Sequence, residues 1–369
     1  MLEGEVLTEA QRAMTICNAC RYCEGFCAVF PAMELRRMFT AEDLKYLANL
    51  CHNCRNCYYA CQYAPPHEFM LNVPRTLDRL RRETYKEFAW PRALRRLFEG
   101  NGRTVAWVTV GCMLTALALT FFFRPRQVLL GVHIGEGAFY NVVPYGFMVG
   151  TFLALGFAVL GCLGKAMLSF WRGIGSRPRD LFCIPANFMA LKHTLKLTYL
   201  GGGAQGCNYP EERFSNTRRW LHQALFYGFL LSAVATAVAA FYDHVLGIRA
   251  PYSLWSWPVV LGSLGGLGMI VGTLGLLCLK AKADQGLCHE GALGMDVGFA
   301  VLLLLVALSG LALLVFRETE AMGTLLAIHL GLVGAFFLTA PCGKFVHGLY
   351  RYAALLRNAQ EQMGEQNRA

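Results

Sequence analysis

The sequence is poor in charged residues. Only 16% of its 369 residues are Asp, Glu, Lys or Arg, whereas 55% are hydrophobic. Soluble domains carry about a quarter charged residues, so the composition argues against a chain that is soluble throughout. The polar residues gather in residues 1–100, and the apolar excess begins at Thr104. We therefore expect a polar domain over residues 1–100 and a membrane domain over residues 101–369.

Signatures of secretion and of nucleotide binding are also missing. Residues 1–15 contain no apolar core of a cleavable signal peptide, so we expect the N-terminal domain to stay where it is made. No G-x-G-x-x-G motif opens a β–α–β unit. The glycines at 201–203 and 206 lie in a connection between apolar runs, where they are weak evidence for nucleotide binding. Any flavin would then be bound by another chain.

Long apolar runs, in contrast, are present. A helix needs about 20 residues to cross a bilayer. Six stretches reach that length, at roughly 104–123, 144–170, 220–242, 257–279, 293–316 and 322–349. The sequence predicts a mainly α fold, in which a helical N-terminal domain precedes a bundle of six transmembrane helices.

The distribution of basic residues predicts the orientation of these spans. Residues 75–103 hold nine Arg or Lys and residues 165–219 hold nine more. Connections at the opposite end hold few, namely Arg124, Arg126, Arg249 and Arg317. Positive residues stay cytoplasmic, so we expect both termini in the cytoplasm and the spans in the inner membrane. Because the basic residues flank spans, the net charge of +10 is explained by this rule and by anionic lipid, without nucleic acid.

Eight of the fifteen cysteines form two runs with one spacing, C-x2-C-x2-C-x3-C. The first run is Cys17, Cys20, Cys23 and Cys27, and the second is Cys51, Cys54, Cys57 and Cys61. This is the bacterial ferredoxin spacing for a pair of [4Fe–4S] clusters, in which the fourth cysteine binds the other cluster. We expect one cluster on Cys17, Cys20, Cys23 and Cys61, and the other on Cys51, Cys54, Cys57 and Cys27.

Zinc and disulfides are the alternatives for these cysteines. A zinc site wants four ligands, commonly as two C-x2-C pairs, and disulfides need an oxidising compartment. Neither a zinc site nor a set of disulfides explains two runs of four cysteines with identical spacing. The proline that directly follows the fourth cysteine in ferredoxins comes later here, at Pro31 and Pro65. Most of the other cysteines are expected to be small buried hydrophobes: Cys112, Cys162, Cys183, Cys207, Cys278, Cys288 and Cys342.

The N-terminal domain is expected to be helical around the two cysteine loops. Thr40 and Asp43 resemble a capping box for a short helix that ends near Leu50. Pro74 fits the first turn of a second helix that runs to about Phe88. That second helix is basic, and it is either a membrane-surface or partner-binding helix or a plain solvated one.

Histidines in the apolar runs are the second informative feature, because an intramembrane histidine is costly and therefore suggests function. His329 and His347 are eighteen residues apart in the sixth run, which is five helical turns of about 100° per residue, so both face one way. His222 and His244 lie at the two ends of the third run. Because the third and sixth spans are antiparallel, His222 is level with His347, and His244 with His329.

Opposed histidines at equal depth are what a bis-histidine haem b requires. We expect an inner haem between His222 and His347, and the same argument offers a second, outer haem between His244 and His329. Arg218 lies four residues before His222, and Lys344 three before His347. Each shares a face with its histidine and could reach haem propionates. The alternative is that these histidines are interfacial residues bonded to backbone or lipid.

The order of these parts resembles the tricarballylate-utilisation protein B family (TcuB, also called CitB), and also the C-terminal half of CobZ. The matching stretches are CNACRYCEGFCAVFPAMELRRMF, LCHNCRNCYYACQYAPPHEFMLNVP, GGGAQGCNYPEERFSNTRRWLHQALFYGFLL and PCGKFVHGLYR. The His329–His347 spacing also resembles the haem subunit of respiratory nitrate reductase. There an earlier span supplies two histidines ten residues apart, whereas the equivalent position here is Ser232.

The resemblance implies an electron-transfer subunit rather than the dehydrogenase itself. Such a subunit accepts electrons from a soluble FAD-dependent dehydrogenase that oxidises tricarballylate, and passes them through two [4Fe–4S] clusters and haem b to quinone. A self-contained membrane reductase of the heterodisulfide-reductase-like type is one alternative, although it needs an open coordination site or a further cysteine motif. Two further alternatives remain. One is the electron-transfer part of a cobalamin-precursor oxidase, and the other is a redox sensor that carries no electron flux.

Overall fold

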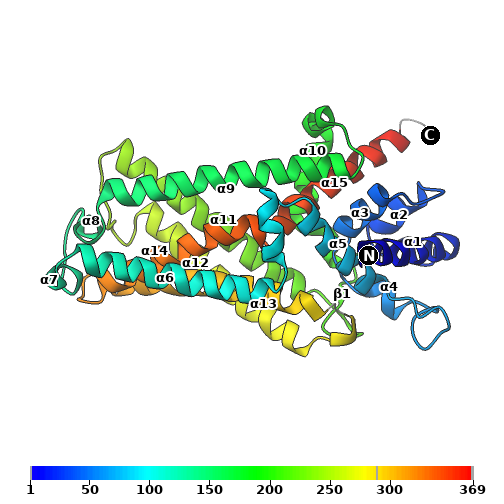
Figure 1. Cartoon of the computed structure of the whole chain (residues 1–369), viewed down its shortest axis with the longest axis horizontal. Helices are drawn as coiled ribbons and strands as arrows, with labels where there is room; N and C mark the ends of the chain where they lie inside the picture. The colour runs from blue at the N-terminus through cyan, green and yellow to red at the C-terminus, as the bar shows by residue number, and fades with distance from the viewer. Residues whose placement is uncertain (1, 288–289, 367–369) are drawn as a thin grey trace.

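The computed structural model describes residues 2–287 and 290–366, so Cys288 lies outside the described residues. The molecule is elongated, with the N-terminal domain at one end of a long helical bundle (Figure 1). The N-terminal domain contains five α-helices among its described residues, followed by the 3-10 helix η1 at Arg92–Phe98: α1 (Leu2–Cys20), α2 (Val29–Glu34), α3 (Ala41–Leu50), α4 (Asn56–Tyr59) and α5 (Val73–Glu87).

Local sequence explains two of these helices. Thr40 caps α3 with the predicted capping box, because its side chain accepts from the Asp43 N–H while Asp43 accepts from the Thr40 N–H. At the start of α5, the Asn72 side chain accepts from the Arg75 N–H, and Pro74 occupies the first turn. Both helices therefore begin where the sequence predicts.

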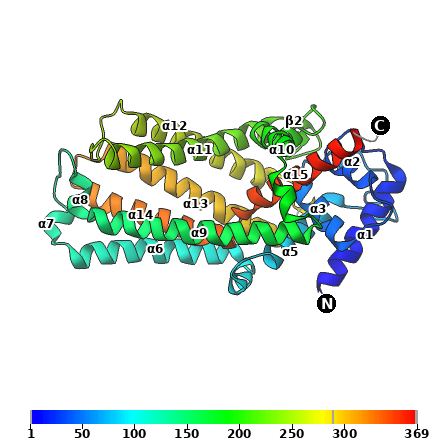
Figure 2. The same ribbon diagram turned by 90° about the horizontal axis from the view of Figure 1, so that it is seen from above.

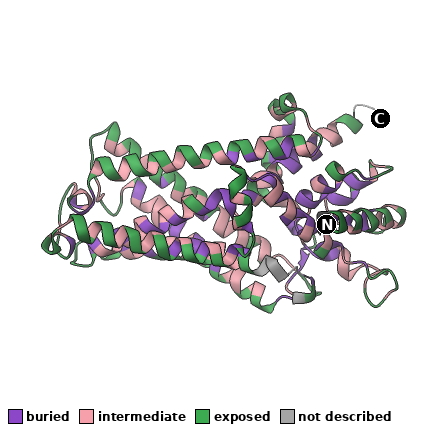
Figure 3. Ribbon diagram, viewed as in Figure 1, coloured by how far each residue is buried: buried purple, intermediate pink, exposed green. Residues whose placement is uncertain are grey.

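Among the described residues, six helices are long and apolar enough to cross a membrane, as the sequence predicts. They are α6 (Asn101–Phe123), α9 (Tyr145–Gly173), α11 (Thr217–His244), α12 (Trp257–Lys282), α13 (Glu290–Val315) and α14 (Met322–Thr339). Outward faces of α6 and α9 are exposed along their length (Figure 3). These faces carry large apolar side chains such as Trp107 and Phe157, which suits contact with lipid.

The connections differ between the two ends of the bundle. The short helices α7 (Arg126–Leu129) and α8 (Ala138–Val142) lie at the end far from the N-terminal domain (Figure 1). The near end carries α10 (Ile184–Lys196), the two-stranded antiparallel sheet of β1 (Cys207–Asn208) and β2 (Phe214–Ser215), and α15 (Val346–Gln366). Four 3-10 helices also connect spans: η2 (Pro178–Phe182), η3 (Thr198–Gly201), η4 (Gln285–Leu287) and η5 (Ala340–Cys342). Both ends of the described chain lie at the near end (Figure 2).

The sixth span is shorter than predicted. The helix α14 ends at Thr339, a 3-10 turn follows at Ala340–Cys342, and α15 begins at Val346. Pro341 explains the break, because proline lacks an N–H and its ring clashes with the carbonyl four residues earlier. The prediction of one continuous helix over 322–349 is therefore wrong. His329 and His347 lie on different helices, so the argument that five turns of one helix align them does not apply.

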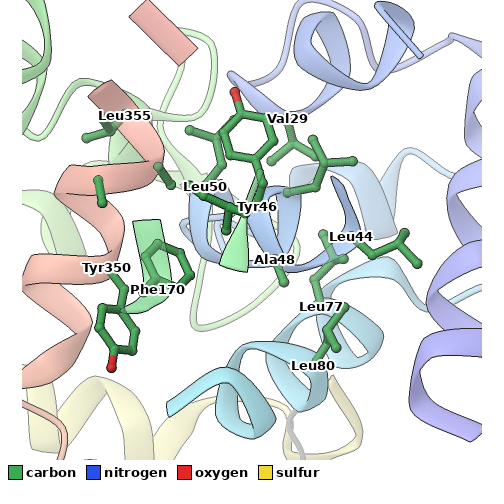
Figure 4. Packing of buried hydrophobic residues seen from close by; sticks show 14 of the residues in the cluster. Val29, Leu44, Tyr46, Ala48, Leu50, Leu77, Leu80, Phe170, Tyr350 and Leu355 are labelled. Atoms are coloured by element: carbon green, nitrogen blue, oxygen red, sulfur yellow. The ribbon is translucent and has the colours of Figure 1, made fainter. Parts of the chain in front are cut away.

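The basic helix α5 is buried along one face, so the expectation of a plain solvated helix is wrong. Leu77, Leu80 and Tyr85 are buried in the core of the N-terminal domain (Figure 4). That core continues into the bundle, where Phe170 of α9 stacks on Tyr350 of α15 with ring centroids 4.5 Å apart. The N-terminal domain is thus packed directly on the near ends of α9 and α15.

Candidate functional site

The two cysteine runs surround two cavities in the N-terminal domain. The first cavity has a volume of about 240 Å³, and five cysteines line it: Cys17, Cys20, Cys23, Cys57 and Cys61. The second is smaller, about 20 Å³, and its lining includes Cys27, Cys51, Cys54 and Cys57. Each cavity is thus lined by cysteines of both runs, and Cys57 lines both cavities. The assignment of four ligands to each cluster stays a prediction.

The thiols have the character of a cluster-binding set. Burial raises the pKa of Cys17 and of Cys23 to about 12, and the neighbouring cysteines add to the effect. Thiols crowded in this way become thiolates only when a cation compensates their charge, and iron in a cluster supplies it. Among the described residues, no three His, Cys, Asp or Glu side chains converge as a single-ion site requires. The cysteines therefore line the two cavities without meeting at one point.

The loop of the second cysteine run is held by arginines from three helices. Arg81 of α5 donates to the Cys51 carbonyl at 2.5 Å, and Arg351 of α15 donates to the same oxygen at 2.9 Å. Arg218 of α11 donates to the Asn53 carbonyl at 2.6 Å. The φ angle of Asn53 is +53°, in the left-handed region that asparagine tolerates. The loop of the second cavity is thus tied to two helices of the membrane domain.

The rings of His222 and His347 face each other across α11 and α15. Their centroids are 6.4 Å apart, and the ring planes are inclined by 75°. Two imidazoles on opposite sides of one metal ion would place their centroids about 6 Å apart, because each metal–nitrogen bond is about 2 Å long. The observed separation is therefore compatible with two imidazoles that would hold one metal ion between them.

The hydrogen bonds of these rings also suit ligation. Nδ1 of His347 lies 2.5 Å from the Lys344 carbonyl, so this nitrogen donates and Nε2 remains as the acceptor. Nδ1 of His222 is buried and has no hydrogen-bond partner among the described residues. Burial lowers the pKa of His347 well below its ordinary value, and the charges of Lys344 and Arg351 lower it further. The imidazole is then neutral, which is the form that binds metal.

The histidine pair and the second cavity are joined by the same two helices. Arg218 precedes His222 by four residues, and Arg351 follows His347 by four residues. Residues four apart lie on one helix face. Each histidine therefore lies one helical turn from the arginine that holds the second cysteine loop. The geometry brings the candidate haem ligands next to the candidate second cluster.

Arg218 and Lys344 have protein partners. Besides Asn53, Arg218 contacts the ring of Tyr209, with its guanidinium carbon 4.7 Å from the ring centroid. Nζ of Lys344 lies 2.7 Å from Asp296 at the start of α13. Binding of a propionate by either side chain stays a prediction, and it would have to add to these contacts.

The outer pair of histidines is not brought together by any contact between described residues. His244 is half exposed, and its Nε2 lies 2.9 Å from the Tyr145 hydroxyl while its Nδ1 lies 2.9 Å from the Ala240 carbonyl. His329 instead faces α13, where Ser309 Oγ lies 2.9 Å from its Nδ1. Both ring nitrogens of His244 are occupied, so the structure offers no support for a second haem between these residues.

Cys207 is a residue of the site that the sequence did not single out. It is fully buried in β1, where it packs in one buried cluster with Cys54 of the second cavity, and its thiol donates to the Leu200 carbonyl at 2.6 Å. A lone cysteine has no spacing to identify it. The one available signal is that GGGAQGCNYP lies within a stretch that carries the family resemblance.

Comparisons with known proteins give the family. The family model described as "Citrate utilization protein B" matches residues 100–368, and the one described as "Citrate utilization protein B Fer4-like domain" matches residues 10–87. The chain belongs to the citrate utilization protein B family. Citrate utilization protein B of Escherichia coli is 45% identical over 370 residues, which cover 98% of this chain and 95% of that protein. No solved structure matches.

Family and fold together establish the broad class. The chain is a mainly helical membrane protein with an N-terminal Fer4-like domain and, among its described residues, six candidate spans. The cysteine-rich Fer4-like domain suggests iron–sulfur clusters. This combination fits a role in electron transfer at a membrane.

Proposed function

We propose that the chain is the membrane electron-transfer subunit of a flavin-to-quinone oxidoreductase. It accepts electrons from a soluble FAD-dependent dehydrogenase of the tricarballylate dehydrogenase type and delivers them to quinone. Residues 1–100 hold two [4Fe–4S] clusters, and residues 101–369 hold haem b. The observation that carries the proposal is the His222–His347 pair, which lies one helical turn from the arginines on the second cysteine loop.

Cysteines and histidines of the chain would hold the cofactors along the proposed electron path. Cys17, Cys20, Cys23 and Cys61 would hold the first cluster, and Cys27, Cys51, Cys54 and Cys57 the second. Cys57 lines both cavities, so the two sites are adjacent. His222 and His347 would hold a low-spin six-coordinate haem iron, which exchanges single electrons and has no open position.

The buried charge around this path favours electron-carrying groups with negative charge. Arg218 and Arg351 donate to carbonyls of the second cysteine loop, whereas Arg81, which also donates there, already has Asp78 as its anionic partner. Four thiolates give a cluster a net negative charge, and so do the propionates of a haem. Buried cations without matching anions are costly, and bound cofactors of this kind would balance them.

The membrane orientation belongs to the same proposal. Both ends of the described chain lie at the end of the bundle that carries the N-terminal domain. The basic connections lie at this end as well, which supports a cytoplasmic location for both termini in the inner membrane. A soluble cytoplasmic dehydrogenase would then reach the first cluster directly.

A self-contained reductase is less well supported. It needs an open coordination site or a further cysteine near a cluster that substrate can reach. Cys207 does lie against Cys54, but it is fully buried. A substrate would have no access to this thiol.

The test uses membranes that contain the chain, mixed with the purified flavoprotein and tricarballylate. Haem b should become reduced, and added quinone should reoxidise it. Membranes with Cys57→Ser should keep the haem but fail to reduce it through the flavoprotein. Haem reduction that is as fast in the variant as in the unaltered chain would contradict the proposed route.

A further inference from the structure

The helix α10 carries an exposed stripe of apolar side chains. Ile184 is 80% exposed, Phe188 72% and Leu191 46%. Residues at intervals of four and three share one face of a helix, and we call this face of α10 the outer stripe. An amphipathic helix of a soluble protein turns its apolar face to the core, whereas α10 turns the outer stripe away from it. The outer stripe therefore needs apolar surroundings that the described residues do not supply.

The opposite face of α10 is fixed to α15. Ala186 and Ala190 are buried in the core that α15 also enters. The Tyr352 hydroxyl of α15 donates to Asn187 Oδ1 at 2.6 Å. Rotating α10 about its axis would break this hydrogen bond and expose the two alanines. The folded chain therefore holds the outer stripe in its outward position.

The C-terminal end of α10 lies level with the start of the α11 span. The Tyr227 hydroxyl donates to the Leu195 carbonyl at 2.9 Å, and Arg219 Nη2 donates to the Lys196 carbonyl at 2.9 Å. Figure 2 shows α10 nearly end-on, whereas the spans run along the view, so α10 crosses the direction of the spans. Trp220 follows Arg219 and is exposed, and tryptophan is typical of the boundary between hydrocarbon and headgroups. These contacts place α10 at that boundary.

Two basic residues lie beside the outer stripe. Lys192 and Lys196 are both exposed, and they are four residues apart on one face of α10. No ion pair between described residues involves either of them, whereas Arg179, before α10, pairs with Asp180 at 3.7 Å. Lysine can lay its stem along an apolar surface and hold its ammonium group at the level of the headgroups. Anionic headgroups complement two such charges.

We propose that α10 is an interfacial helix that binds anionic phospholipid in the leaflet at the near end of the bundle. The outer stripe enters the acyl boundary, and Lys192 and Lys196 hold the headgroups, as in other amphipathic helices that lie in a membrane surface. The occupant is lipid rather than a soluble protein, because α10 lies level with a span and beside the exposed faces of α9 and α11. This inference requires only that the chain crosses a bilayer, and it is independent of the electron route.

The first test is hydroxyl-radical footprinting of the full chain, purified and placed in nanodiscs of equal parts phosphatidylcholine and phosphatidylglycerol. Each oxidation rate is divided by that of the free amino acid. Phe188 should be protected as fully as Trp107 on the outward face of α6, whereas Met38 of the N-terminal domain should be oxidised. All three side chains are more than two-thirds exposed in the structure, so only lipid distinguishes them. Oxidation of Phe188 at the relative rate of Met38 would overturn the inference and favour a protein partner.

The second test measures the preference for anionic headgroups. Phosphatidylglycerol is added to the chain in neutral detergent, and the concentration that gives half of the thermal stabilisation is recorded. Each basic residue near an anionic surface is worth about a fivefold gain in affinity, so Lys192→Gln/Lys196→Gln should raise this concentration about 25-fold. The matched control is Arg37→Gln/Arg75→Gln, which removes two exposed charges of the N-terminal domain and should leave the concentration unchanged.

Three results of the second test would overturn the role of the two lysines. Phosphatidylglycerol could fail to stabilise the unaltered chain, Lys192→Gln/Lys196→Gln could respond as the unaltered chain does, or the control could lose as much affinity as that variant. The last result would assign the attraction to net charge and not to α10.

Discussion

The imidazole rings of His222 and His347 face each other with their centroids 6.4 Å apart. One helical turn away on each helix, Arg218 and Arg351 donate to backbone carbonyls of the second cysteine loop. The same two helices therefore position the histidine pair and one wall of the second cavity. We expect changes in these arginines to affect transfer between the two centres without removing either of them.

Replacing Arg351 tests this connection. Arg351→Met keeps an unbranched side chain but removes the donor to the Cys51 carbonyl. Loss of a hydrogen bond from a charged group should lower the free energy of unfolding by about 1.5–3 kcal/mol. The rate of haem reduction by dithionite-reduced clusters should fall, while haem and iron contents stay unchanged. Rapid-mixing absorbance measures the rate, and a rate equal to that of the unaltered chain would argue against the coupling.

The crossed grouping of cysteines predicts which variants behave alike. Cys61→Ser should alter the same cluster signal as Cys20→Ser, because both residues line the first cavity. Cys27→Ser should alter the other signal, together with Cys51→Ser. Electron paramagnetic resonance of the reduced variants distinguishes the signals. If Cys61→Ser groups with Cys51→Ser, each run binds its own cluster and the crossed assignment is wrong.

Asp296 balances several cations at the near end of the bundle. Its carboxylate lies 2.5 Å from Lys280, 2.7 Å from Lys344 and 3.8 Å from Arg82. Asp296→Asn removes the carboxylate that compensates the charge of Lys344, so it should destabilise the protein by about 3–5 kcal/mol. Thermal unfolding in detergent measures this loss. Glu318→Gln, which removes an exposed carboxylate near Arg317, should change stability by less than about 0.5 kcal/mol.

The lowered pKa of the Asp43 carboxyl leads us to expect that α3 and α15 lose a stabilising contact at acid pH. Burial alone would raise its pKa, but the hydrogen bonds from Arg36 and Thr40 outweigh burial and lower the pKa below its ordinary value. The unfolded chain then binds a proton more readily than the folded one. This contribution to stability is present above about pH 4 and is lost as the pH falls through the folded pKa.

Unfolding measured between pH 7 and pH 3 checks this prediction. Asp43→Asn should lower stability at pH 7 and flatten its decline at acid pH. Glu42→Gln is the control at the neighbouring position, and it should keep the decline. An Asp43→Asn variant with the same acid profile as the unaltered chain would contradict the role of Asp43.

The sequence was informative where the signal is local. Cysteine spacing predicted that the two runs lie together, because ligands of a cluster follow one another at short intervals, and cysteines of both runs line each cavity. Apolar run length predicted the six candidate spans found among the described residues, because bilayer thickness sets the length of a helix. The capping box at Thr40 predicted the start of α3.

The sequence was misleading for features that depend on contacts between residues far apart in the chain. The basic helix α5 looked solvated, yet Arg81 is buried because it donates to Asp78 and to the Cys51 carbonyl. The prediction that His222 lies level with His347 agrees with the observed ring contact. The argument that His329 and His347 share one face of one helix was wrong, since Pro341 interrupts the helix. Cys207 could not be found, because only the fold brings it to Cys54.

The central claim is that His222 and His347 bind the haem nearest the clusters. The most direct measurement is the low-spin haem signal in electron paramagnetic resonance of His347→Ala, compared with His222→Ala and His329→Ala in the same membranes. We predict that either of the first two substitutions abolishes this signal and leaves both cluster signals intact, whereas His329→Ala keeps it. Loss of all haem in His329→Ala, with the signal retained in His347→Ala, would contradict the account.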